Sequence, residues 1–155
     1  MLLSDHFAPG SILYLPHART RAELFPLLAQ AIGSSCAEVD PGQILSGIVE
    51  REAKMPTSIG LGIAVPHARI ASVPGLLAAV AICPAGLDYS VPDGKPVRLA
   101  FLLVSPPSAA GLHVRALAAV GRVSSTRVAD LLESTDADDF LVRWKLGEAQ
   151  ASGCS

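Results

Sequence analysis

A histidine directly follows a short apolar segment within the stretch REAKMPTSIGLGIAVPHAR, which runs from Arg51 to Arg69. Residues 63–65 form an apolar run that is too short for a helix, so they predict a buried strand. Pro66 has no N–H to donate and should end that strand, which leaves His67 at the tip of a rigid element. An imidazole in such a place can exchange a proton, bind a metal ion or act as a nucleophile near neutral pH. It can equally be a strand-end histidine that is hydrogen-bonded to the backbone.

A second histidine, His113, is predicted to lie in the first turn of a helix that begins at Ser108 or Gly111. It shares one helix face with apolar residues three, four and seven positions further on. A lone histidine on an apolar face is more often a core residue than a ligand or a catalyst, so this pattern leaves its role open. His6 and His17 have no motif neighbours, and both are predicted to be solvated.

Arg51 and Glu52 end a predicted helix that starts at residues 40–41, where Asp followed by Pro is typical of a helix start. Arg51 lies seven residues after Ile44 and therefore extends the apolar side of the helix, close to where the chain turns toward His67. Two interpretations are open. The pair is solvated at the helix end, or the Arg51 guanidinium faces an anion at His67.

The elements that must position these residues follow from the apolar periodicity. Gly60 and Gly62 allow a sharp turn or a close approach of the backbone just before the strand that precedes His67. A further helix has capping-box spacing at Thr20 and Glu23. Predicted strands are 11–15, 63–65, 76–83 and 97–104, and predicted helices are about 20–33, from 40, from 108 or 111, and from the capping box at 135–138. Helices that alternate with buried strands predict a three-layer α/β domain.

Length and composition fit one domain over residues 1–155, with a core at about 11–147 and a frayed tail at 148–155. Half of the residues are hydrophobic, 17% are charged, and the formal net charge is −2, which gives no basic footprint for nucleic acid. No apolar run approaches the roughly 20 residues that span a bilayer. The N-terminal residues lack the pattern of a secretion signal. We therefore expect a cytoplasmic protein.

The three cysteines are Cys36, Cys83 and Cys154, and they are far apart in the sequence. Their odd number and the lack of CxxC spacing predict a reducing compartment without a structural disulfide. A metal site built on the histidines lacks nearby carboxylate or thiolate partners in sequence. We expect no cofactor and no metal.

The pattern R-E-x-x-x-P-T-x-I-G-x-G-I-A-x-P-H-A-R resembles the active-site motif of enzyme IIA domains of the fructose–mannitol class. These belong to the bacterial phosphoenolpyruvate-dependent sugar phosphotransferase system and include its nitrogen-regulatory branch. A second match, HVRALA, begins at His113, and a D-G-x-P-V element begins at Asp93 and is interpreted as a structural turn. The resemblance runs from about residue 11 to 146. Ser58 stands where the family commonly has glycine, and Val114 where it has leucine, but neither change removes a reactive group.

The resemblance implies a central mixed sheet with helices on both faces, an α/β/α domain with the active histidine at a sheet end. It implies that His67 carries a phosphoryl group and that His113 orients it or donates to a phosphoryl oxygen. Arg51 would offset negative charge, and Thr57 would supply a hydroxyl donor. The ring nitrogens of the two histidines are expected within about 4 Å to 7 Å of each other. Transfer should fall below about pH 6, as an imidazole protonates.

The implied phosphoryl donor is HPr or its nitrogen-branch paralogue, and the acceptor is either an enzyme IIB or a regulatory target. The chain would be a transporter subunit or a regulator, and we expect no direct membrane insertion. A non-catalytic binding module with the same fold is the alternative, although a scaffold has no need for the four predicted site residues. The docking face should be apolar, through Ile59, Leu61, Ile63 and Val73.

Overall fold

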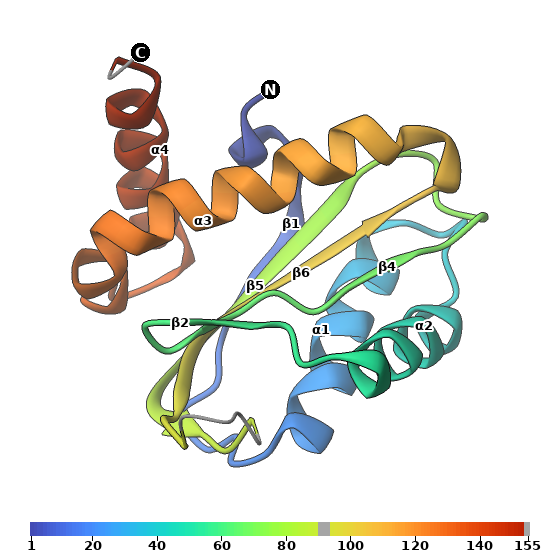
Figure 1. The fold of residues 1–155 in the computed structure, drawn as a ribbon, viewed down its shortest axis with the longest axis horizontal. Coiled ribbons are helices and arrows are strands. Elements are labelled where there is room, and N and C mark those ends of the chain that lie inside the picture. The colour runs from blue at the N-terminus through green and yellow to red at the C-terminus, as the bar shows by residue number, and fades with distance from the viewer. Residues whose placement is uncertain (90–93, 154–155) are drawn as a thin grey trace.

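A mixed sheet lies between two layers of helices in the computed structural model, which describes residues 1–89 and 94–153 (Figure 1). The α/β/α architecture that the sequence predicted is therefore confirmed. Asp93, the first residue of the D-G-x-P-V element, and Cys154 lie outside the described residues. The elements are, in chain order, η1 (Leu3–His6), β1 (Phe7–Tyr14), α1 (Arg21–Ser35), α2 (Pro41–Lys54), β2 (Ser58–Gly60), β3 (Ile63–Ala64), β4 (His67–Arg69), β5 (Leu77–Leu87), β6 (Val97–Ser105), η2 (Pro107–Ala109), α3 (Ala110–Leu132) and α4 (Ala137–Gly153).

Strand β6 is the central element for the site, because it pairs with three other strands. Within the described residues the sheet has the order β1-β5-β6-β3-β2, and β4 follows β3 along the same edge of β6. The β5–β6 pair is antiparallel, whereas β3 and β4 both run parallel to β6. As predicted, the strand ends before Pro66, since β3 stops at Ala64, but the pairing along β6 continues beyond it. Val65 and Pro66 interrupt the ladder for two residues, the Pro66 carbonyl accepts from the Leu103 N–H at 3.1 Å, and His67 resumes the pairing opposite Leu103.

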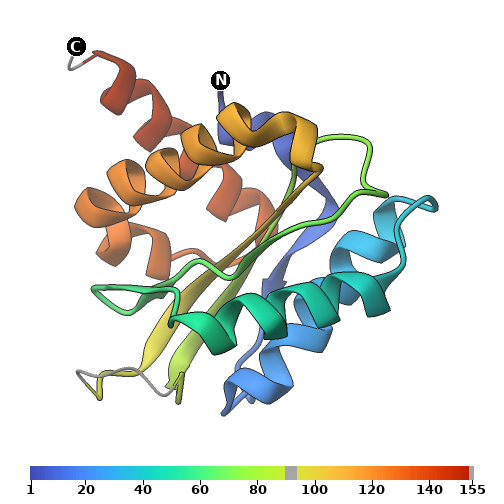
Figure 2. The same cartoon turned by 45° about the vertical axis from the view of Figure 1, so that its right-hand side comes forward.

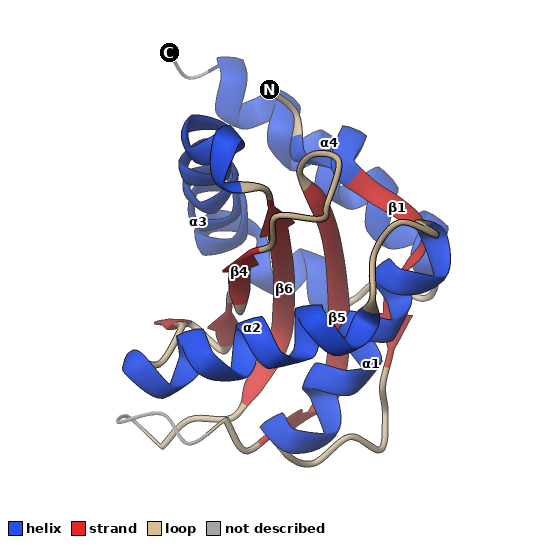
Figure 3. Ribbon diagram, turned by 90° about the vertical axis from the view of Figure 1, so that its right-hand side faces the viewer, coloured by secondary structure: helices blue, strands red, loops and turns tan. Residues whose placement is uncertain are grey.

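Side chains that alternate along β6 divide the interior into two cores. Ala100 and Leu102 pack with α1 and α2, whereas Leu99, Phe101 and Leu103 pack with α3 and α4. Figure 3 shows the two helical layers on opposite faces of the sheet, and Figure 2 shows α3 and α4 together on one of them. Burial on both faces explains why β6 reads as a continuous apolar run rather than an alternating one.

Helix starts agree with the capping signals in the sequence. The Thr20 hydroxyl accepts from the Glu23 N–H at 3.3 Å, and the Asp40 carboxylate accepts from the Gly42 N–H at 2.9 Å. The strand predicted at 76–83, in contrast, does not end before Pro84, because β5 continues to Leu87. Its pairing with β6 shifts register between Ile82 and Leu87, and such an irregularity tolerates a residue that cannot donate.

The two ends of the described chain are fastened to each other. The Glu148 carboxylate accepts from the Ser4 N–H at 3.0 Å and from the Ser4 hydroxyl at 2.6 Å. Glu148 is 6% exposed, and α4 continues to Gly153. The predicted frayed tail at 148–155 is therefore wrong over its described part, because a buried carboxylate has found a partner there. His6 is also not free in solvent, since its Nδ1 lies 3.2 Å from the Leu76 carbonyl oxygen.

Cys36 and Cys83 are free thiols, one half-buried and one buried in β5. Burial raises the pKa of the Cys83 thiol to about 11, so this residue behaves as a small apolar side chain. Among the described residues, no helix has the length and apolar character needed to cross a membrane.

Candidate active site

His67 is the first residue of β4, and its ring is fixed by the backbone two residues earlier. Its Nδ1 lies 2.8 Å from the Val65 carbonyl oxygen. Because a carbonyl can only accept, Nδ1 carries the ring proton and Nε2 keeps its lone pair. The backbone hydrogen bond that the simpler interpretation anticipated is therefore present. It also leaves Nε2 as the nucleophilic atom.

A tight hairpin turn holds Val65 in place. Gly60, Leu61 and Gly62 all have positive φ angles, of 87°, 58° and 74°. Two glycines adopt this conformation at little cost, whereas leucine rarely does so. The turn brings β2 and β3 together as an antiparallel pair, and the Val65 N–H donates to the Thr57 carbonyl at 2.9 Å. Both the N–H and the carbonyl of Val65, the residue that orients His67, are thus hydrogen-bonded.

His113 meets His67 edge to face, with ring centroids 5.3 Å apart and an angle of 60° between the ring planes. The sequence separates them by 46 positions, but α3 starts beside the end of β6 and aims its first turn at β4. His113 is 2% exposed, and its Nδ1 lies 2.6 Å from the hydroxyl oxygen of Ser105, the last residue of β6. A hydroxyl that donates to Nδ1 leaves Nε2–H as a donor.

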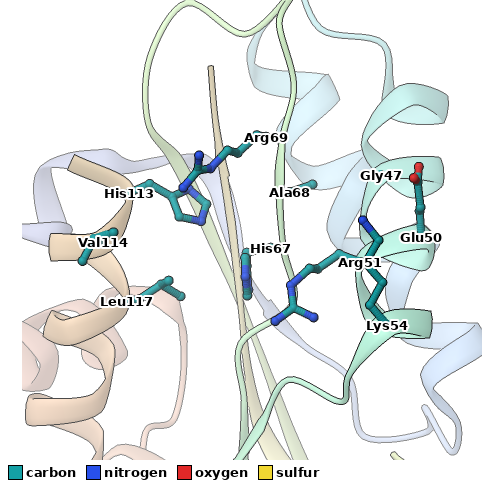
Figure 4. Close-up of a pocket in the computed structure, with 10 residues that line it drawn as sticks. All are labelled: Gly47, Glu50, Arg51, Lys54, His67, Ala68, Arg69, His113, Val114 and Leu117. Atoms are coloured by element: carbon teal, nitrogen blue, oxygen red, sulfur yellow. The ribbon is translucent and has the colours of Figure 1, made fainter. Parts of the chain in front are cut away.

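Two guanidinium groups flank the histidine pair, as Figure 4 shows. Arg51 extends from α2 toward His67, and its Nη1 donates to the Met55 carbonyl at 3.0 Å. Arg69 reaches from β4 toward His113. These residues line a cleft of about 380 Å³ together with Lys54. The remaining lining residues are Gly47, Glu50, Ala68, Val114 and Leu117. We call this the cationic cleft.

The cationic cleft suits a phosphoryl group by charge. Guanidinium groups donate in the fork geometry that phosphate oxygens accept. The placement of Arg51 agrees with the interpretation in which its guanidinium faces an anion at His67.

A second cleft, of about 310 Å³, lies on the other side of Arg51 and His67. Its walls include Ile59, Val65, Leu117 and Gly121, so we call it the apolar cleft. Ile59 is 51% exposed, and Leu61, at the hairpin tip, is 60% exposed.

Two of the four residues predicted for the docking face are not available to a partner. Ile63 is 1% exposed and Val73 is 3% exposed. Both belong to the cores, because the pleat of β3 turns Ile63 inward and Val73 packs in the core beneath α1 and α2.

Thr57 lines the apolar cleft and not the cationic cleft, and its hydroxyl is bonded to other side chains. The hydroxyl donates to the Glu52 carboxylate at 2.6 Å and lies 2.9 Å from the Tyr89 hydroxyl oxygen. Thr57 and Glu52 are each 6% exposed. The prediction that Thr57 is a direct donor is therefore corrected: its single hydroxyl proton is already engaged, so it can act on the site only by holding the backbone.

Burial keeps both histidines neutral over a wider pH range than a free imidazole. It lowers the pKa of His67, and the nearby Arg51 and Arg69 lower it further, against the opposing effect of the Val65 carbonyl. Burial, with the charges of His67 and Arg69, lowers the pKa of His113 to about 4. Each group loses charge rather than gaining it on folding, so an attacking lone pair on His67 persists into mildly acid solution.

We therefore expect phosphorylation of His67 to hold its rate down to a lower pH than an ordinary imidazole would allow. As the pH falls through the lowered pKa of His67, Nε2 takes up a proton and the rate decreases. Ring-proton NMR should show the His113 resonances titrating near pH 4 and those of His67 below the range of a model peptide. A His67 ring that titrates above that range would contradict the assigned environment.

Sequence reasoning did not predict that Glu52 is buried or that Arg69 belongs to the site, although the spacing contained a signal for both. Glu52 follows Ile44 and Ile48 at four-residue intervals, which places all three on the buried stripe of α2. Arg69 follows His67 by two residues in a strand, so both side chains lie on one face. Tyr89 and Ser105, which bond to Thr57 and His113, had no motif that could reveal them.

The site thus combines a sheet-edge histidine, a second histidine and two arginines around one cleft. Residues 5–142 match the family model described as phosphoenolpyruvate-dependent sugar phosphotransferase system, EIIA 2. The chain belongs to this enzyme IIA type 2 family, and the resemblance seen in the sequence is confirmed.

Individual relatives come from both branches of the family. A nitrogen regulatory protein of Pseudomonas aeruginosa is 28% identical over 139 residues, which cover 90% of this chain and 85% of the relative. The crystal structure of nitrogen regulatory protein IIA-Ntr from Neisseria meningitidis has a TM-score of 0.79 at 23% identity, over 92% of this chain and 98% of that one. Mannitol IIA of Escherichia coli, in complex with phosphorylated IIB, has a TM-score of 0.75 at 18% identity, over 90% and 98%.

Proposed function

We propose that the protein is a phosphocarrier that accepts a phosphoryl group on Nε2 of His67 from a phosphohistidine of HPr or its nitrogen-branch paralogue. The observation that supports this most strongly is the hydrogen bond from Nδ1 to the Val65 carbonyl, 2.8 Å long, which leaves Nε2 unprotonated beside two guanidinium groups. A phosphocarrier needs a reachable, neutral imidazole and cations for the phosphoryl oxygens rather than covalent assistance.

In the proposed step, the N–P bond of the donor ring breaks as a new N–P bond forms at Nε2 of His67. The donor nitrogen recovers its lone pair. Nδ1 of His67 keeps its proton and continues to donate a hydrogen bond to the Val65 carbonyl. Arg51 and Arg69 offset the charge on the phosphoryl oxygens. His113, with Ser105 donating to its Nδ1, donates from Nε2 to one of those oxygens. One phosphohistidine replaces another, so the free-energy change is small.

The direct test is incubation with phosphoenolpyruvate, enzyme I and HPr, followed by intact mass. One added phosphoryl group that is labile in acid is the expected result. No mass change with active HPr would reject the proposal and favour the alternative, a binding module that keeps the fold without transfer.

The acceptor distinguishes the two branches of the family. A relative that covers 90% of this chain is named a nitrogen regulatory protein, which supports a regulatory role. On that basis the phosphorylated protein should keep its phosphoryl group when a fructose-type IIB is added. Rapid transfer to IIB would instead identify a transporter subunit, since a solved relative is a IIA complex with phosphorylated IIB.

The apolar cleft should receive an apolar side chain of the donor protein, and Gly121 offers a way to test this. A Cβ at Gly121 meets nothing within 4 Å, so Gly121→Leu is chosen to place a side chain in the cleft. We expect the Kd for HPr, measured by NMR titration, to rise about tenfold. Ala129→Leu, on an exposed position of the same helix outside both clefts, is the control. Equal affinities for the two variants would place docking elsewhere.

A further inference from the structure

Glu52 is a buried carboxylate in an unfavourable position, at the C-terminal end of α2. The partial negative charge of a helix C-terminus repels an anion, and a buried charge is costly unless it is paired and hydrogen-bonded. Glu52 meets this requirement in full. Its oxygens accept from the Thr57 N–H at 2.9 Å and the Thr57 hydroxyl at 2.6 Å, and Arg21 Nη1 lies 3.5 Å away.

A continuous series of hydrogen bonds leads from Glu52 to the ring of His67. Glu52 holds the N–H and the hydroxyl of Thr57. The carbonyl of Thr57 accepts from the Val65 N–H at 2.9 Å, and the carbonyl of Val65 accepts from His67 Nδ1 at 2.8 Å. Each bond fixes the group that makes the next one, so a shift of Thr57 would move the acceptor that sets the tautomer of His67.

The other side of the series is anchored on α1 and at the end of β5. Arg21 donates to the Tyr89 carbonyl at 3.3 Å, and its guanidinium carbon lies 5.4 Å from the centre of the Tyr89 ring. The Tyr89 hydroxyl is 2.9 Å from the Thr57 hydroxyl oxygen and donates to it, because the Thr57 proton is given to Glu52. The cluster therefore joins α1, α2 and the segment that follows β5.

We propose that Glu52 is a positioning residue, which holds His67 in the Nδ1–H tautomer through Thr57 and Val65 and so keeps Nε2 free to accept a phosphoryl group. The consequence for transfer rests on the proposed function, whereas the tautomer is a property of the unphosphorylated protein. Glu52 touches neither the phosphoryl group nor the cationic cleft in this assignment.

The charged and titratable groups that face His67 come from every element packed around it. They are Arg51 and Glu52 from α2, Arg69 from β4 and His113 from α3, and Glu50 and Lys54 of α2 line the same cleft. Glu52 raises the pKa of His67, whereas Arg51 and Arg69 lower it. Removal of the Glu52 charge and of the Val65 hydrogen bond both favour the neutral ring, so Glu52→Gln should move the titration of His67 to lower pH.

The chain provides a matched control for this substitution. Glu148 is also 6% exposed, and it also accepts from a backbone N–H at 3.0 Å and a hydroxyl at 2.6 Å, both of Ser4. Glu148 lines neither cleft around His67. Glu52→Gln and Glu148→Gln therefore remove the same kind of bond at two places, and only one of them leads to His67.

The test is ¹⁵N NMR of the histidine rings in the full-length protein, together with the initial rate of phosphorylation by phospho-HPr. We expect the Nδ1–H tautomer in the wild type and in Glu148→Gln, and a mixture of tautomers in Glu52→Gln. The rate for Glu52→Gln should fall roughly tenfold or more relative to Glu148→Gln. Ring shifts and rates equal to those of Glu148→Gln would overturn the proposal.

If the Glu52→Gln protein does not fold, a second pair of variants at Thr57 tests the same proposal. Thr57→Ser keeps the hydroxyl and should keep the wild-type tautomer, whereas Thr57→Val removes it and should give the mixture. Equal ring shifts for this pair would count against the proposal. If the wild type accepts no phosphoryl group, the proposed function fails, but the ring shifts still decide the role of Glu52.

Discussion

His67→Ala should abolish phosphorylation of the protein by phospho-HPr. The substitution removes the only ring in the cationic cleft whose Nε2 is left unprotonated by a backbone hydrogen bond, among the residues the structure describes. His113 cannot take its place, because it is 2% exposed and bonded to Ser105 at 2.6 Å. Intact mass after incubation with phosphoenolpyruvate, enzyme I and HPr should show no added phosphoryl group.

His6→Ala is the control for this experiment. His6 lies outside both clefts and bonds to the Leu76 carbonyl, so its loss should leave phosphorylation intact. Acid-labile phosphate on the His67→Ala protein would show that another residue is the acceptor.

His113→Ala should slow phosphoryl transfer by about a hundredfold or more, which is the usual effect of removing one positioned donor from a site of developing charge. His113 is neutral near pH 7, because burial lowers its pKa to about 4. We therefore expect it to act as a hydrogen-bond donor and not as a cation. A quenched time course of phosphorylation at saturating phospho-HPr would measure the effect on the transfer step itself.

Two variants separate the donor from mere packing. His113→Gln keeps an N–H donor and should recover part of the rate, whereas His113→Leu fills the space without a donor and should not. Ser105→Ala removes the hydroxyl partner of His113 and should fall between them. A His113→Leu protein with the rate of the wild type would mean that His113 only packs against His67.

Much of this architecture could be predicted because local signals and burial agree. The caps at Thr20 and Asp40 and the apolar run of β6 each specify one structure, and each is found. Two predictions were wrong for a common reason, namely the strand end before Pro84 and the frayed C-terminal tail. A residue that usually ends an element, or a run of small residues, says nothing about partners that lie far away in the sequence, such as Ser4 for Glu148.

The site was predictable only as far as single motifs extend. His67 and Arg51 lie within one stretch, and the spacing of His113 placed it on an inward helix face. The contact between the two histidines depends on how α3 meets β4, which no local pattern encodes. The position of Thr57 beside Glu52 and Tyr89 is likewise a tertiary result, and it changes Thr57 from a donor at the surface to a buried link.

The hydrogen bonds between Ser4 and Glu148 have a consequence for how this domain can be linked to other domains. They hold η1 next to α4, the first and last described elements of the chain. Neither end lines the clefts around His67. A tether or fusion partner at either terminus would therefore leave His67 accessible to a docking protein. The domain can thus be joined to other domains without blocking this site.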